Sequence, residues 1–215
     1  GDEHFVVHTK EGDYESKMVI WAAGTIAKQI EAEGEEEYVG RGISYCAICD
    51  GSFHEKQNVV VIGGGNSAIE EALYLAKICK KVTIITRGHH FRADPVLMEK
   101  VMRANNVDLV THHVITKFTG KDLLEQVTAK DRDSDNEIVL NVRGAFIYVG
   151  FTPSSTLLEN FDILDEDKYI IVDRNCETKV TGLYAAGDCI QKNIRQIATA
   201  LADGITCASA IVRKI

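Results

Sequence analysis

The chain has 215 residues, of which 45% are hydrophobic and 26% charged, and its formal net charge is −8 at pH 7. This length allows one large or two small domains and a sizeable core. The negative charge argues against nucleic acid or an anionic membrane as the main partner. No apolar run approaches the ~20 residues that a membrane span needs, and no signal peptide is visible. Six sparse cysteines fit a reducing cytoplasm better than a secreted disulfide scaffold.

The first part of the chain predicts strands and a loop. Residues 5–8 are expected to form the first strand of a β-hairpin, residues 12–13 its turn, and residues 17–22 a second, more buried strand. Residues 31–37 hold five Glu and predict a solvated linker.

From residue 58 onward the pattern alternates between buried strands and helices. Strands are predicted at residues 59–62, 82–85 and 107–110. A helix follows the first strand, and a second helix is expected at residues 94–105 with Val96, Leu97, Val101 and Met102 pointing inward. An antiparallel meander is predicted next, at residues 114–118, 124–129 and 137–142. The remaining predicted elements are strands at residues 145–149, 169–172 and 183–186 and a helix at residues 195–212.

A glycine-rich loop follows the strand at residues 59–62 and fits the pattern G-x-G-x-x-A. Gly63 permits the tight turn, Gly65 lets a pyrophosphate approach the backbone, and Ala68 lets helix and strand pack closely. The backbone N–H groups and the helix dipole would then hold the phosphates. The loop predicts a dinucleotide site, with a glycine-rich turn that binds nothing as the alternative. Its residues are Gly63, Gly64, Gly65, Asn66, Ser67 and Ala68, and Asn66 or Ser67 is expected to cap the helix.

The end of the next strand favours NADP(H) over NAD(H). An NAD site usually places Asp or Glu there, but residues 86–92 contain no acidic residue. Arg87 and Arg92 can instead bind a 2′-phosphate as paired donors. Two solvated arginines are the alternative, and His89 and His90 are interpreted as ordinary loop histidines.

The sequence Cys46-Ala47-Ile48-Cys49-Asp50 predicts a redox-active pair. Two residues between cysteines let the sulfurs either join or separate into thiols, one of which often has a depressed pKa. Asp50 could move the proton that thiol–disulfide exchange requires. Zinc is the competing interpretation, but no second CxxC exists, so no metal site is predicted. The four other cysteines are expected to be small buried hydrophobes: Cys79, Cys176, Cys189 and Cys207.

With both motifs in place, the chain resembles the bacterial-type, low-molecular-weight thioredoxin reductases nearly end to end. The segments that carry the resemblance are residues 19–24 (VIWAAG), 40–51 (GRGISYCAICDG), 63–72 (GGGNSAIEEA), 182–188 (GLYAAGD) and 195–200 (RQIATA). The resemblance implies an α/β, Rossmann-like FAD/NAD(P)-binding fold of three layers, a parallel sheet plus an antiparallel β-meander, with an incomplete second domain of the same type. Residues 27–152 would form the NADP(H)-binding domain with the CxxC pair. Residues 1–26 and 153–215 would belong to a discontinuous FAD-binding domain, and the hinges would lie at residues 25–29 and 150–154.

The same resemblance implies a chemistry and a set of cofactor residues. NADPH would reduce FAD, FAD would reduce the Cys46–Cys49 disulfide, and the dithiol would reduce thioredoxin or a similar protein. The intact protein would be a cytoplasmic homodimer. The residues expected to lie near FAD are Gly187, Asp188, Arg195, Gln196 and Ile197.

Three features depart from the family pattern. The family carries an earlier G-x-G-x-x-G unit for FAD, whereas this chain has a single such loop at Gly63, so we expect a chain that lacks the N-terminal part of the FAD domain. Gly88 stands where a second Arg is frequent, and Ala23 replaces a Thr. Two alternatives therefore stay open: an NADP(H)-binding fragment without FAD or turnover, and a ferredoxin- or peroxiredoxin-linked relative.

Overall fold

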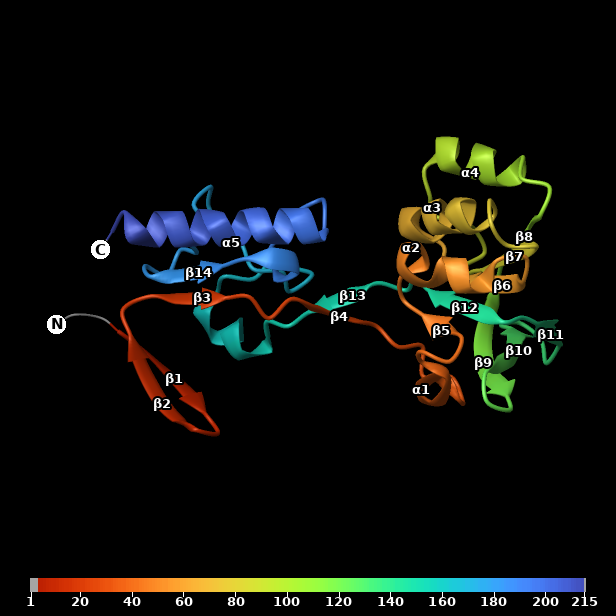
Figure 1. The fold of residues 1–215 in the computed structure, drawn as a ribbon, viewed down its shortest axis with the longest axis horizontal. Coiled ribbons are helices and arrows are strands. Elements are labelled where there is room, and N and C mark those ends of the chain that lie inside the picture. Colours follow the sequence, from red (N-terminus) through yellow and green to blue (C-terminus); the bar gives the residue numbers. More distant parts are fainter. Residues whose placement is uncertain (1–3, 215) are drawn as a thin grey trace. The chain divides into compact units, whose positions relative to one another are not determined.

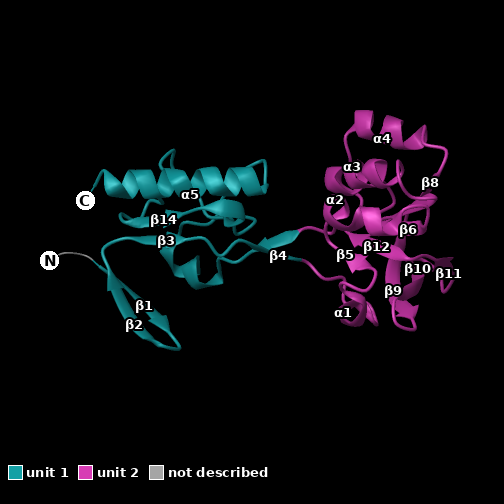
Figure 2. Cartoon of the chain, in the orientation of Figure 1, with its two compact units in different colours: residues 1–27, 151–215 teal, residues 28–150 magenta. Residues whose placement is uncertain are grey.

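The computed structural model describes residues 4–214 (Figure 1). The chain forms two compact units, one made of the residues up to Ala27 and from Phe151 onward, the other of Lys28–Gly150 (Figure 2). These boundaries lie within two residues of those expected from the sequence. The assignment of the units to FAD and NADP(H) stays a prediction.

The second unit, residues 28–150, is built on a five-stranded parallel sheet. Its strands, in spatial order, are β5 (Ile43–Ser44), β12 (Gly144–Ile147), β6 (Asn58–Ile62), β7 (Lys81–Ile85) and β8 (Val107–Val110). The continuous apolar runs in β6 and β7 are explained by this position, because a central parallel strand is covered on both faces. The three predicted strands at residues 59–62, 82–85 and 107–110 are confirmed.

Both faces of this sheet are covered. On one face, Val59 and Val61 pack with the helices α2 (Ala47–Asp50), α3 (Asn66–Leu75) and α4 (Pro95–Met102) or the residues around them. On the other face, Val60 and Ile62 pack against a three-stranded antiparallel meander of β9 (His113–Gly120), β10 (Leu124–Asp131) and β11 (Glu137–Asn141). The three-layer α/β architecture with an inserted meander is therefore confirmed.

The helix caps correct part of the sequence analysis. Gly65, rather than Asn66 or Ser67, is the N-cap of α3, and the Asn66 Oδ1 accepts a hydrogen bond from the Asp94 N–H at 2.7 Å. The expectation that Val96 and Met102 point inward is wrong, since they are 58% and 72% exposed. Because α4 is the outer helix and contacts α3 on one side, only a narrow stripe around Val101 is buried.

The first unit contains three strand pairs and the long C-terminal helix. The hairpin consists of β1 (Phe5–Thr9) and β2 (Gly12–Ser16). A parallel pair joins β3 (Val19–Trp21) and β14 (Leu183–Ala185), and an antiparallel pair joins β4 (Thr25–Ala27) and β13 (Phe151–Pro153). Short 3₁₀ turns cover Thr156–Phe161 and Gly187–Cys189, and α5 spans Ile197–Val212.

Three expectations for individual segments are wrong. The hairpin partner of β1 is β2, not residues 17–22. The sequence did not indicate β2, because this strand is solvent-exposed throughout and lacks the alternation that marks a half-buried strand. Residues 169–172 form isolated bridges at Ile170 instead of a strand. The acidic stretch is not a solvated linker throughout, since it contains the helix α1 (Glu35–Tyr38). Glu35 is only 3% exposed, and its buried carboxylate accepts a hydrogen bond from the Ile30 N–H at 3.0 Å.

No helix among residues 4–214 combines the length and apolar character needed to cross a membrane.

Candidate active site

The cysteine pair follows the short strand β5 in the chain and belongs to α2, on the helix-covered face of the sheet. Cys46 is the N-cap of the four-residue helix α2, and its sulfur accepts a hydrogen bond from the Cys49 N–H at 3.2 Å. The two sulfurs are joined in a disulfide. Cys46 is half-buried whereas Cys49 is exposed, so Cys49 is the more accessible to another protein.

Asp50, the predicted proton carrier, is held by a residue that the sequence did not indicate. The hydroxyl of buried Ser44 donates to the Asp50 Oδ2 at 2.6 Å and accepts from the Cys46 N–H at 3.0 Å. Ser44 thus fixes the carboxylate and the backbone of the first cysteine together. Both Ser44 and Asp50 line a pocket of about 560 Å³.

His54 lines the same pocket, in the 3₁₀ turn Gly51–His54 that follows α2. Its ring meets the Phe146 ring edge-on, with 5.5 Å between the centroids. Burial lowers the pKa of His54, although the negative charge of Asp50 acts in the opposite direction. Its Nδ1 is buried and has no hydrogen-bond partner among the described residues. The neutral imidazole is therefore the favoured form at this position.

The three glycines of the loop differ in how much room each leaves for a side chain. Gly63 has φ +152°, and a Cβ there would lie 2.4 Å from the Tyr148 carbonyl oxygen and 3.0 Å from the Ala68 Cβ. A Cβ on Gly64 would lie 2.4 Å from the Thr86 Oγ1. A Cβ on Gly65 would meet nothing within 4 Å. Gly65 thus faces open space at the first turn of α3, where free N–H groups can hold phosphate oxygens.

Arg87 and Arg92 lie in the segment between β7 and α4. The Arg92 N–H donates to the Gly64 carbonyl at 2.6 Å, so this segment lies directly against the glycine loop. Both side chains are exposed, and neither guanidinium makes an ion pair with any residue between 4 and 214. Their donors are therefore available to a phosphate.

Tyr148, a second residue that the sequence did not indicate, connects the two motifs. Its hydroxyl accepts a hydrogen bond from the Ala47 N–H at 2.7 Å, and its carbonyl oxygen packs against Gly63. Burial raises the pKa of Tyr148, so its hydroxyl stays protonated. Ala47 and Ala68 also belong to one hydrophobic cluster. The structure therefore brings the cysteine pair and the glycine loop together on the helix-covered face of the sheet.

In the first unit, Asp188 and Arg195 lie in contact. The Arg195 Nε donates to the Asp188 carbonyl at 3.2 Å, and its guanidinium lies over the Tyr169 ring at 3.9 Å. The preceding residue, Gly187, has φ +83° and its N–H donates to the Asp203 carboxylate at 3.1 Å. Three of the five predicted flavin residues therefore form one local cluster.

Gln196 and Ile197 mark the start of α5. Gln196 is its N-cap and forms a reciprocal capping box with Thr199, while Ile197 is 81% exposed. The Asp188 Oδ1 is buried without a hydrogen-bond partner among the described residues, its nearest cation being the Lys192 Nζ at 3.7 Å. An acceptor in this position fits a hydroxyl of a bound cofactor.

Comparison with known proteins agrees with this arrangement. Residues 1–204 match the family model for pyridine nucleotide-disulphide oxidoreductases. The chain is 39% identical over 214 residues to a thioredoxin reductase of Bacillus subtilis, covering 98% of this chain and 67% of that protein. It is 38% identical over 213 residues to the thioredoxin reductase of Peptoclostridium litorale, with 96% and 68% covered. The chain thus spans about two thirds of the length of these relatives.

Solved structures give the same result. The thioredoxin reductase of Streptococcus pyogenes is 36% identical with a TM-score of 0.85, covering 99% of this chain and 70% of that one. The thioredoxin reductase of T. acidophilum is 34% identical with a TM-score of 0.76, with 97% and 69% covered. The chain therefore belongs to the pyridine nucleotide-disulphide oxidoreductases and, among them, to the thioredoxin reductases.

Proposed function

We propose that the intact protein is an NADPH-dependent flavoprotein that passes electrons through FAD to the Cys46–Cys49 disulfide, and from there to thioredoxin or a similar protein. The observation that carries this proposal is the placement of a disulfide with an exposed Cys49 beside a phosphate-compatible loop at Gly65, within one compact unit. The names of the relatives support the identity of the protein partner.

The overall step balances as follows. NADPH, one proton and the Cys46–Cys49 disulfide give NADP⁺ and two thiols, and the dithiol then exchanges with a disulfide of the partner. When bound, the flavin supplies a carrier that accepts and returns an electron pair. Asp50 holds or releases the proton at the sulfurs, and Ser44 keeps its carboxylate in place. Because Cys49 is the exposed member, we place the first contact with the partner at its sulfur.

The cofactor residues in this proposal belong to both units. The loop Gly63–Ala68 holds the NADPH pyrophosphate, while Arg87 and Arg92 bind the 2′-phosphate. FAD is held by the residues around Asp188 and Arg195. The buried Oδ1 of Asp188 offers an acceptor, and the guanidinium of Arg195, which lies over an aromatic ring, offers donors. We also propose that the intact protein is a cytoplasmic homodimer.

A Cys49→Ser variant tests the redox role of the pair. We expect the full-length protein to consume NADPH in the presence of a disulfide reporter and the variant to fall to background, because no internal disulfide can form. Cys79→Ser is the matched control, since the Cys79 thiol is buried and its pKa is raised to about 11 by burial. Turnover retained in Cys49→Ser would contradict the proposal.

A second candidate function is NADP(H) binding without turnover, which the single glycine loop at Gly63 favours. This candidate concerns the 215-residue chain by itself, and an absorbance spectrum of that purified chain tests it. A band at about 450 nm, as expected of a bound flavin, would contradict this second candidate, whereas NADPH binding without that band supports it.

A further inference from the structure

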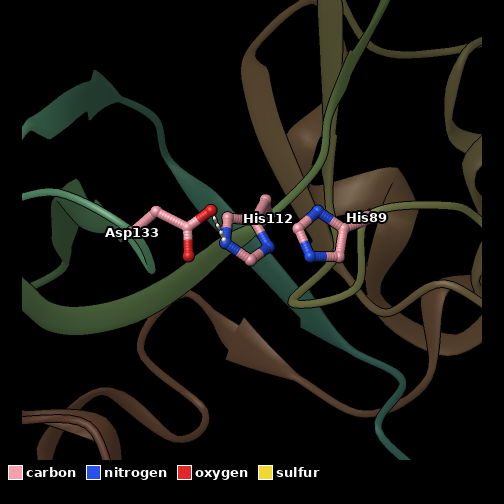
Figure 3. Close-up of side chains that lie close together, drawn as sticks. All are labelled: His89, His112 and Asp133. Carbon is pink, nitrogen blue, oxygen red and sulfur yellow. Dashed lines mark ion pairs between the residues drawn. The ribbon is translucent and has the colours of Figure 1, made fainter.

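A cluster of metal-ligating side chains lies in the second unit, outside the residues assigned above. His89 lies in the loop after β7, His112 in the turn before β9, and Asp133 in the turn between β10 and β11 (Figure 3). One ligand atom from each lies within 4.8 Å of the other two. We propose that the His89–His112–Asp133 cluster binds a divalent transition-metal ion of the Zn²⁺ type.

His112 is the fixed member of this cluster. Its backbone N–H donates to the Gly88 carbonyl at 2.9 Å, and its carbonyl accepts from the Arg132 N–H at 3.0 Å. Two hydrogen bonds thus hold the residue in the left-handed region, at φ +60°. A ligand carried on a backbone held in this way is preorganised, because little freedom remains to be lost on binding.

The two ring nitrogens of His112 are buried without hydrogen-bond partners among the described residues. Its side chain is only 13% exposed, and neither ring nitrogen makes a hydrogen bond to a residue between 4 and 214. The Nε2 lies 2.9 Å from the Asp133 Oδ2, but this ion-pair contact lacks the alignment of a hydrogen bond. Buried polar atoms are normally satisfied. A nitrogen lone pair and a carboxylate oxygen that meet in this way form two adjacent positions of a metal coordination shell.

His89 supplies the third ligand, from an exposed position. Its ring stacks on that of His112, with 3.9 Å between centroids and 14° between planes (Figure 3). The nitrogen lone pairs of the two stacked rings lie in nearly parallel planes, so they do not point toward one common position. The exposed His89 therefore turns about its side-chain bonds to complete the site, while His112 and Asp133 stay in place.

The ligand set selects the type of ion. Two imidazole nitrogens and one carboxylate oxygen suit Zn²⁺, Co²⁺ or Ni²⁺, whereas Mg²⁺ and Ca²⁺ prefer oxygen ligands alone. Three protein ligands leave a fourth tetrahedral position for water, and the exposure of His89 and Asp133 leaves that position open to solvent.

A titration with Zn²⁺ tests the site. The chain, free of any affinity tag and with the Cys46–Cys49 disulfide oxidised, competes for Zn²⁺ with a chromophoric chelator. We expect one ion per chain, no effect of millimolar Mg²⁺, and a loss of affinity of at least about tenfold in His89→Ala and in Asp133→Asn. The matched controls His90→Ala and Asp135→Asn should bind as the unmodified chain does. Because all four of these side chains are exposed, the variants are expected to fold.

Three outcomes would overturn the proposal. The first is no stoichiometric Zn²⁺ binding by the unmodified chain. The second is an equal loss of affinity in the control variants, which indicates adventitious surface binding. The third is a loss of Zn²⁺ binding in a Cys46→Ser, Cys49→Ser double variant, because that result places the ion on the cysteines. The titration does not depend on NADPH or FAD, so it is independent of the proposed reductase function.

Discussion

Gly63 and Gly65 lack side chains for different physical reasons. At Gly63 the backbone itself forbids a side chain, since φ is +152° and a Cβ would meet the Tyr148 carbonyl. At Gly65 the backbone is extended, with φ −98° and ψ −178°, and a Cβ would point into open space. The first glycine therefore serves the fold, and the second leaves room for a ligand.

This difference predicts opposite effects of two alanine substitutions. We expect Gly65→Ala to change the free energy of unfolding by less than about 0.5 kcal/mol but to lower NADPH affinity, because the methyl group occupies the phosphate position. Gly63→Ala is the contrasting variant and should destabilise the fold by about 1–3 kcal/mol or more. Urea unfolding and calorimetric titration with NADPH measure both. Unchanged NADPH affinity in Gly65→Ala would show that the loop does not hold a pyrophosphate.

Some roles of single residues could be read from the sequence and others could not. The roles proposed for Gly63 and Ala68 follow from local chain geometry, so a spacing pattern is enough to predict them. Ser44 and Tyr148 were missed because their function depends on partners that no spacing rule connects to them, such as the contact between Tyr148 and Ala47. The arginines were predicted as exposed donors, and their binding of a 2′-phosphate stays a prediction.

At the scale of elements, α2 shows how a very short helix is stabilised from outside. Four residues cannot form a helix by intrinsic propensity, because nucleation is unfavourable. Ala47 is fully buried among the residues of the helix-covered face, and its N–H is bonded to the Tyr148 hydroxyl. The position of the cysteine pair thus depends on a hydroxyl contributed just after β12.

We therefore expect Tyr148→Phe to destabilise the second unit. The substitution leaves the buried Ala47 N–H without its partner, which costs about 1–3 kcal/mol. Tyr74→Phe is the matched control, since no hydrogen bond of its hydroxyl occurs among the described residues, and it should shift the free energy of unfolding by less than about 0.5 kcal/mol. Equal urea midpoints for the two variants would contradict this role of Tyr148.

The elements that were predicted correctly share one property. Strands β6, β7 and β8 and the meander carry apolar runs or alternation over several residues, which is a signal contained in the sequence itself. Among the elements that were missed, β5 and α1 are short and contact distant parts of the chain, namely β12 and β9. β2 was missed for another reason, since it is exposed throughout and pairs only with its neighbour β1. Residues 169–172 show the reverse error, since Ile170 is buried in irregular chain with isolated bridges while its neighbour Ile171 is 46% exposed.

At the scale of the whole molecule, the α/β class and the family could be predicted from the order of motifs, whereas the metal-binding cluster could not. His89, His112 and Asp133 lie in three separate connections, and only the packing of the meander on the sheet brings them together. The packing of strands therefore also creates sites that sequence motifs cannot predict.

The stability of the protein is expected to depend on pH through His54. Burial holds its pKa below the unfolded value of 6.5, so as pH falls the unfolded chain takes up a proton before the folded chain does. The stabilisation is complete above about pH 6.5 and declines as pH falls toward the folded-state pKa. His54→Phe keeps an aromatic ring against Phe146 but cannot take up this proton. Between pH 7.5 and pH 5.5 we therefore expect the melting temperature of the variant to fall less than that of the unmodified chain. Parallel pH dependences for the two proteins would contradict this assignment.

The spatial order of the sheet also has a consequence for biosynthesis. β12 lies between β5 and β6, although residues 144–147 leave the ribosome long after residues 43–62. A nascent chain that ends before residue 144 therefore carries Cys46 and Cys49 on a segment without its neighbouring strand. During that interval the Ala47 N–H also lacks the Tyr148 hydroxyl, so the last strand of this sheet to be synthesised completes the surroundings of the two sulfurs.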